Sequence, residues 1–169
     1  MKKEDIQKRV LQHGKPLALD KFEWDEKTKT FSSREINLVL DFKNRNKCTF
    51  ITLHDCIFIT GYGCTFTTGR GCYFITKNLC NFKTEEACNF KTEHDCIFKT
   101  GSYCVFNTSR NCDFKAGRWC TFNVLEDCVI KAGVNSVAIR RDIFEVIQIP
   151  LGKQIQLNDY KNNGYIILN

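Results

Sequence analysis

The sequence predicts an all-β protein: a single-chain β-solenoid with two octads, or 16 residues, per coil and two facing parallel sheets. We also expect a short N-terminal helix and a C-terminal β cap. Three observations support this fold. All 11 cysteines fall at every eighth position from Cys48 to Cys128. Phe stands two positions after each Cys up to Phe122, and Thr follows two positions later up to Thr108. The variable residues of the last five units alternate with a period of two units.

Each octad is interpreted as a strand followed by a corner. Cys, Phe and Thr alternate with variable residues, so a strand would place these three side chains on one face. The next three residues are often turn formers, as in Gly61-Tyr62-Gly63 and Gly69-Arg70-Gly71. A strand this short cannot bury its Phe alone, so coils must stack about 4.8 Å apart. We expect Phe to face Phe across the core, each ring contributing about 1.5 to 3 kcal/mol by burial.

The number of octads per coil follows from the variable positions, because stacked residues in a solenoid tend to match. The fourth position of the last five units reads Lys99, Asn107, Lys115, Asn123 and Lys131. This alternation indicates two octads per coil, whereas a three-sided coil predicts a period of three. A three-chain intertwined β-helix, also built on octads, remains the structural alternative.

The flanks are predicted to be capping elements. We expect an N-terminal helix and capping arm in residues 1–39, the solenoid in 40–135, and a C-terminal β capping segment in 136–169. Residues 4–13 are predicted to form a helix that ends at Gly14. Short strands are expected at residues 143–149, 154–157 and 165–168.

Composition narrows the class of protein. The N-terminal stretch is charged where a secretory signal would be apolar, and no apolar run reaches 18 residues. The odd count of 11 cysteines cannot pair completely within one chain. We therefore expect a soluble protein of a reducing compartment, the cytoplasm, without membrane partners. The formal charge of +6 does not by itself indicate a nucleic-acid partner.

Four roles for the cysteines compete: disulfides, metal ligation, catalysis and packing. Systematic disulfides between coils would strain the ladder, because parallel neighbours point their Cβ atoms the same way. Zinc needs converging ligands, and the usual C-x-x-C pairs are missing. A soft ion such as Cu(I) could still bridge neighbouring thiols. Catalytic chemistry needs one singular Cys, whereas these are equivalent by pattern. We favour packing, with Cys as a small buried side chain beside Phe, and expect no metal site and no cofactor.

Two surface sites stand out. One broad face is predicted to carry Ile57, Ile59, Tyr73 and Ile75, an apolar interaction surface unless an N-terminal arm with Phe22, Trp24 and Phe31 covers it. We favour coverage by the arm. The other site is a column of lysines at 16-residue spacing that could bind an anion: Lys83, Lys99, Lys115 and Lys131. The competing interpretation is that these lysines keep a flat sheet face from aggregating.

Catalytic signatures are weak. His54 and His94 fall in corners an odd number of octads apart, which puts them on opposite edges of a two-octad coil. We find no combination of nucleophile, base and acid in the pattern, and expect no catalytic residues and no enzymatic activity.

The tandem units Cys64-Thr-Phe-Thr-Thr-Gly69 and Cys96-Ile-Phe-Lys-Thr-Gly101 resemble the C-x-F-x-T-G octapeptide-repeat proteins of phage, giant-virus and environmental origin. The closing stretch Ile139-Arg-Arg-Asp-Ile-Phe-Glu-Val-Ile147 is similar to their C-terminal ends, and the likeness spans about residues 15 to 168. The resemblance implies a viral β-solenoid, which would then be associated with a virion. It transfers no activity.

We therefore expect a structural or interaction protein, a rigid rod that docks a protein partner or another copy of itself. The alternative is an anion-binding module that uses the lysine column to hold nucleic acid or an acidic glycan. A third hypothesis is storage of a soft metal or of thiols.

Overall fold

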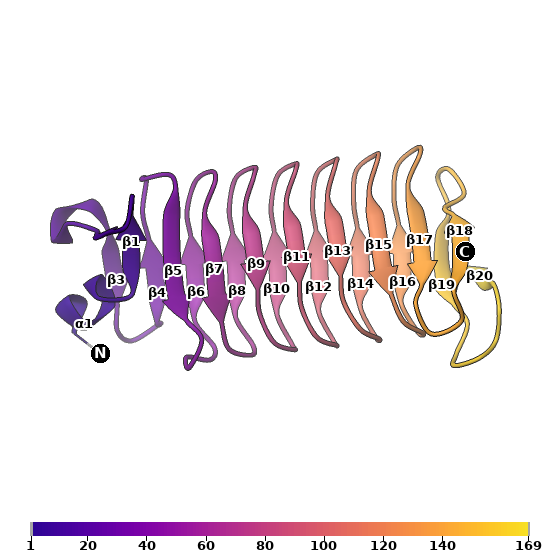
Figure 1. Ribbon diagram of the computed structural model, residues 1–169, viewed down its shortest axis with the longest axis horizontal. Coiled ribbons are helices and arrows are strands. Elements are labelled where there is room, and N and C mark those ends of the chain that lie inside the picture. The colour runs from indigo at the N-terminus through magenta and orange to yellow at the C-terminus, as the bar shows by residue number, and fades with distance from the viewer. Residues whose placement is uncertain (1, 169) are drawn as a thin grey trace.

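The protein is an elongated rod of about seven coils with its termini at opposite ends (Figure 1). The structure is a computed structural model that describes residues 2 to 168. Two ten-stranded sheets, A and B, lie face to face along the rod. The predicted β-solenoid with 16 residues per coil is confirmed, and one chain builds it.

Sheet A consists, from the N-terminal end, of β2 (Lys15–Pro16), β1 (Val10–Gln12), β5 (Leu38–Phe42), β7 (Ile57–Thr60), β9 (Tyr73–Ile75), β11 (Asn89–Lys91), β13 (Val105–Asn107), β15 (Thr121–Val124), β17 (Val137–Arg140) and β18 (Glu145–Gln148). Sheet B consists of β3 (Glu23–Asp25), β4 (Thr30–Ser32), β6 (Thr49–Ile51), β8 (Thr65–Thr67), β10 (Asn81–Lys83), β12 (Ile97–Lys99), β14 (Asp113–Lys115), β16 (Val129–Lys131), β19 (Gln154–Leu157) and β20 (Tyr165–Leu168).

The coils stack in strict register. From β4 to β16 in sheet B and from β5 to β17 in sheet A, every neighbouring pair of strands is parallel. Phe pairs with Phe, as Phe82 does with Phe98. Equivalent residues therefore form columns along the rod.

The core is a double column of phenylalanine rings. From Phe50 to Phe122, rings 16 residues apart stack nearly parallel with centroids 4.8 to 5.2 Å apart. Rings of successive octads come from opposite sheets and meet edge to face at 5.1 to 5.7 Å. Both are favourable arrangements of the ring quadrupole, so the aromatic core adds geometric specificity to hydrophobic burial.

The corners depend on one backbone conformation. The residue before each Cys has a positive φ, whether it is a glycine, as at Gly71 (69°), or a bulky residue, as at Leu79 (60°) and Trp119 (59°). The backbone N–H of this residue also bonds to the next coil. The N–H of Leu79, for example, donates to the His94 carbonyl of the next coil at 3.2 Å. The left-handed conformation is disfavoured for side chains other than glycine, so the stacked coils hold these corners in place.

The N-terminal helix is shorter than predicted. Helix α1 covers Lys3–Gln7 rather than residues 4–13, because the following segment forms β1, turns at His13 and Gly14 with positive φ at both, and returns as β2. β1 lies antiparallel on β5, which buries Val10 and satisfies the open edge of the first coil. A 3-10 turn follows at Leu19–Lys21. None of the helices within residues 2 to 168 has the length and apolar character needed to cross a bilayer.

The C-terminal cap is antiparallel throughout, with β18 on β17, β19 on β16 and β20 on β19. The three expected strands are therefore present. Reversing the strand direction ends the parallel solenoid at β16 and β17.

Candidate functional site

The apolar face predicted from the sequence exists on sheet A. We use that name for Ile57, Ile59, Tyr73 and Ile75. In the register of β7 and β9, Ile57 is paired with Tyr73 and Ile59 with Ile75. All four point outward, because Phe58 and Phe74 between them point into the core. Ile57, Tyr73 and Ile75 are 37 to 39% exposed. The face is therefore open to solvent.

Further apolar side chains extend this face toward the N-terminus. Val39 on β5 is paired with Ile57, and Leu11 on β1 is paired with Val39, so the three lie in one outward row. In the other direction the row continues with Asn89 and Lys91 on β11, which are polar. The apolar surface thus ends sharply at one coil.

The N-terminal arm does not cover the apolar face, and that expectation was wrong. Phe22 and Phe31 are buried at the end of the core, with ring centroids 5.4 Å apart. Trp24 lies 6.4 Å from Phe42. Both strands of the arm, β3 and β4, extend sheet B rather than lying over sheet A. The aromatic residues of the arm cover the open end of the Phe column.

The lysine column also forms as predicted. Lys83, Lys99, Lys115 and Lys131 are neighbours in the register of sheet B, and all are exposed on its outer face. None of the four forms an ion pair with another described residue. The column carries four like charges within three coil spacings, which creates a local positive potential.

The cysteines line the corners of the core as two buried columns. All are unpaired and at most 3% exposed. From Cys48 to Cys120 each Sγ donates to the carbonyl two residues before it, at 3.2 to 3.7 Å. From Cys64 onward a second carbonyl, 19 residues before, lies at 3.4 to 3.9 Å. The thiols therefore act as hydrogen-bond donors to corner carbonyls, a role that the sequence analysis missed.

Adjacent thiols in a column titrate as a coupled set. Contact with the thiols of Cys104 and Cys72, together with burial, raises the pKa of Cys88 well above its ordinary value. Each Sγ also faces carbonyl oxygens, which accept only from a protonated thiol, so this geometry favours the S–H form. Among residues 2 to 168, no three His, Cys, Asp or Glu side chains converge as metal ligands.

The two corner histidines lie on opposite edges of the rod. The His54 corner leads from β6 to β7, and the His94 corner leads from β11 to β12. His54 Nδ1 accepts a hydrogen bond from the Arg70 N–H at 3.1 Å. His94 Nδ1 lies 2.6 Å from Asp95 Oδ2, and this hydrogen bond lowers the pKa of Asp95. His54 is therefore engaged with the corner of the next coil, and His94 within its own corner.

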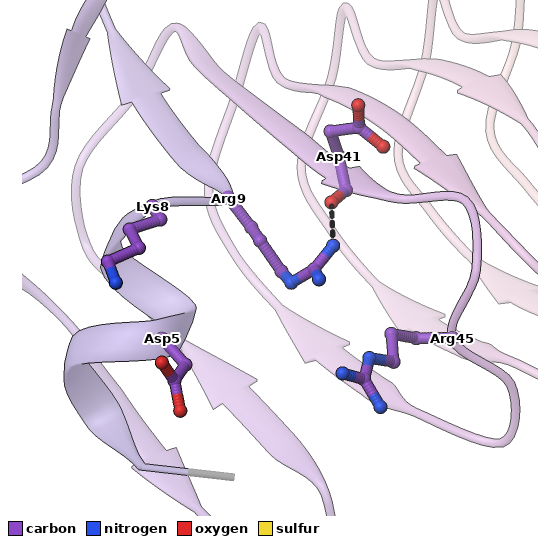
Figure 2. Close-up of a pocket in the computed structure, with 5 residues that line it drawn as sticks. All are labelled: Asp5, Lys8, Arg9, Asp41 and Arg45. Atoms are coloured by element: carbon purple, nitrogen blue, oxygen red, sulfur yellow. Dashed lines mark hydrogen bonds between the residues drawn. The ribbon is translucent and has the colours of Figure 1, made fainter.

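An open pocket of about 510 Å³ lies at the N-terminal end, where the sequence analysis predicted no site. Its lining residues are Asp5, Lys8, Arg9, Asp41 and Arg45 (Figure 2). Arg9 donates to the Asp41 carbonyl at 3.4 Å, while the Asp41 carboxylate points away and lies 3.6 Å from Lys43 Nζ. The lining mixes both signs of charge, so the pocket does not present a concentrated field to an ion.

A buried arginine is the other feature that the sequence analysis missed. Arg140 occupies the inward Thr position of its octad and is fully buried. Its guanidinium binds the Asp142 carboxylate through two N–H groups and donates to the Asn162 carbonyl at 2.9 Å. The hydrogen bond from Arg140 lowers the pKa of Asp142. This pair ties the loop before β20 to the last coil.

Comparison of the chain with family models, curated proteins and solved structures finds no match. The resemblance to octapeptide-repeat proteins and the viral origin that it implies therefore stay predictions from the repeat.

Proposed function

We propose that this chain is a non-enzymatic structural or interaction protein, a rigid rod that presents the apolar face to a protein partner. The observation that carries the proposal is the exposure of Ile57, Tyr73 and Ile75 on a flat sheet surface. Contiguous apolar surface of this kind is typical of interfaces. The parallel ladder and stacked rings hold these side chains in fixed positions, so binding orders little of the scaffold and loses little conformational entropy.

Affinity capture with a matched control tests this proposal. The double variant Ile57→Lys/Ile75→Lys places charge on the apolar face, and the control Ile51→Lys/Ile97→Lys makes the same change on the outer face of sheet B. We expect a protein partner from a host lysate to bind the wild type and the control, and to bind the double variant at least about 100-fold more weakly. Equal capture by all three proteins would contradict the proposal, as would turnover of a substrate by the purified chain.

A second candidate function, anion binding by the lysine column, is favoured by one observation. Four exposed lysines lie in register and form no ion pair with the described residues. Such a row suits a flexible polyanion, either nucleic acid or an acidic glycan, because binding releases the counterions of the polyanion.

Fluorescence anisotropy with a single-stranded oligonucleotide and with heparin measures this binding. The test variant is Lys99→Gln/Lys115→Gln/Lys131→Gln, and the control with equal charge loss is Lys15→Gln/Lys77→Gln/Lys153→Gln. We expect the test variant to reduce the slope of log affinity against log salt by about 2 for the oligonucleotide, and the control to leave it unchanged. Equal effects of the two variants would indicate net charge alone and would refute a role for the column.

A further inference from the structure

The C-terminal end of the rod is an open sheet edge. Sheet A ends in β18 and sheet B ends in β20, and both strands have a partner on one side only. Each edge carries exposed apolar side chains: Val146 on β18 is 68% exposed, and Ile166 and Ile167 on β20 are 53% and 50% exposed. β18 also carries Glu145, whose carboxylate accepts a hydrogen bond from the Gly164 N–H at 2.9 Å. β20 carries no charged residue. Natural proteins usually protect such edges with charges, proline or a covering element.

The register shows which backbone groups are free. The N–H of Ile149 donates to Ser136 at 3.0 Å, so alternate residues of β18 bond to β17, and the N–H and C=O of Val146 and Gln148 point to the open edge. Likewise the N–H of Asn158 donates to Gly164 at 3.2 Å, which leaves the groups of Tyr165 and Ile167 facing outward from β20.

The N-terminal end, in contrast, is closed. β2 has two residues, one of them Pro16, which lacks an N–H donor. β3 carries Glu23 and Asp25, and Glu23 lies 3.7 Å from Lys3 Nζ of helix α1. Helix α1 lies at this end of the rod and buries Ile6 (Figure 1). A second copy therefore finds an unprotected edge at the C-terminal end alone among the described strands.

We infer that two copies of this chain join end to end through their C-terminal edges, with β18 of each copy pairing with β20 of the other. Strands of sheets A and B run in opposite directions. β18 is antiparallel to sheet A, and β20 returns to the direction of sheet B, so β18 and β20 point the same way. A two-fold axis parallel to the strands keeps this direction and places sheet A of one copy in line with sheet B of the other, which makes the new pairs parallel.

The side chains match in this arrangement. Ile147 continues the inward row of Phe122 and Ala138, and Ile167 continues the inward row of Ile155 and Ile130. The axis therefore stacks Ile147 on Ile167 of the second copy and joins the two cores. On the outer face, Val146 comes opposite Ile166 of the second copy. The N–H of Val146 then donates to the Tyr165 carbonyl of the second copy, and its carbonyl accepts from the N–H of Ile167 there.

The offset of the two sheets favours this pairing over β20 against β20. Along the rod, β16 lies half a coil spacing before β17. Sheet A then adds one cap strand, β18, whereas sheet B adds two, β19 and β20, so sheet B ends half a coil spacing beyond sheet A. Joining sheet A to sheet B makes both junctions equal. Joining like sheets would close one junction and leave the other a full strand spacing too wide. The interface is isologous and closes at two copies, so the chain does not form a filament.

Light scattering after size exclusion tests the inference on the full chain. We expect a mass of twice the 19.6 kDa of one chain. Val146→Pro removes an N–H that faces the open edge and no hydrogen bond to β17, and Ile167→Lys places a charge in the joined core. Each is expected to weaken dimerisation at least about 100-fold, whereas Ile97→Lys, at another exposed isoleucine of sheet B, leaves it unchanged. Circular dichroism establishes that the variants are folded. A monomeric wild type at high micromolar concentration would overturn the inference.

Cross-linking distinguishes pairing of β18 with β20 from pairing of β20 with β20. It uses variants that keep the interface intact, so a failure to fold cannot imitate the result. A mixture of Val146→Cys and Ile166→Cys chains should be joined by a short thiol cross-linker, while either chain alone should not. Efficient joining of Ile166→Cys chains to each other would indicate β20 against β20 and would overturn the proposed pairing. This interface shares no residue with the apolar face, so Ile57→Lys/Ile75→Lys should still dimerise, and loss of one property does not imply loss of the other.

Discussion

Replacing Phe98 with alanine probes the aromatic column at its centre. Phe98 is 1% exposed, and its ring lies 4.8 Å from the rings of Phe82 and Phe114 and 5.2 Å from those of Phe90 and Phe106. Truncating a buried Phe to Ala costs about 3 to 5 kcal/mol through lost burial and the cavity that remains. Because the substitution also removes four ring contacts, each worth about 0.5 to 1.5 kcal/mol, we expect a loss in the upper half of that range.

Urea unfolding followed by circular dichroism measures this loss, and Phe144→Ala is the matched control. Phe144 is 91% exposed, so its truncation should change the free energy of unfolding by less than about 0.5 kcal/mol. The two variants make the same chemical change inside and outside the column. Similar losses for both would refute the reasoning that the stacked rings stabilise the rod.

Two further predictions concern the corners and the C-terminal cap. Leu79→Gly should raise the free energy of unfolding by about 0.5 to 1 kcal/mol, because Leu79 has a φ of 60°, whereas Leu151→Gly, at a residue whose own φ is not positive, should not. Asp142→Asn should lower it by about 3 kcal/mol at neutral pH, because Arg140 is left buried without its counter-charge. In the wild type, the lowered pKa of Asp142 means that this stability is present above the unfolded pKa of about 3.9 and is lost as pH falls through the folded value. Urea unfolding at pH 7 and pH 3 measures the loss, which should be smaller in Asp142→Asn than in the wild type, because only the other carboxylates still contribute to it.

The repeat predicts the coil because stacked positions share an environment. Lys99 and Lys115 match at a 16-residue spacing since both lie on the outer face of sheet B, and Asn107 and Asn123 match since they are neighbours in sheet A, where their side chains form a hydrogen bond of 3.0 Å. The inward Cys, Phe and Thr follow from strand alternation alone. Local sequence therefore contains both the strand and its register.

The flanks depend on contacts that the local sequence does not contain. Val10 fits the apolar side of a helix and also a strand, and only the open edge of β5 decides for the strand. The position of Phe22 and Trp24 is decided by the exposed end of the ring column rather than by their own alternation. Arg140 occupies a position where the repeat predicts Thr. The only indication in the sequence that the arginine charge is paired in the core is Asp142, two residues later.

The inward thiols also explain why the corners accept almost any residue. Each Sγ donates to corner carbonyls, so the core side of the corner is satisfied regardless of the outward side chain. Ser136 takes the same place in the next octad, and its hydroxyl reaches the Gly117 carbonyl at 3.5 Å. The Cys position thus needs a small donor rather than a reactive group.

Counting reactive thiols in the native protein tests the inward-facing ladder most directly. A thiol-reactive dye at neutral pH should modify none of the 11 cysteines before unfolding and all of them in denaturant, because every sulfur is buried and bonded as a donor. Rapid modification of several cysteines in the folded protein, or release of a bound metal when the dye reacts, would contradict the account.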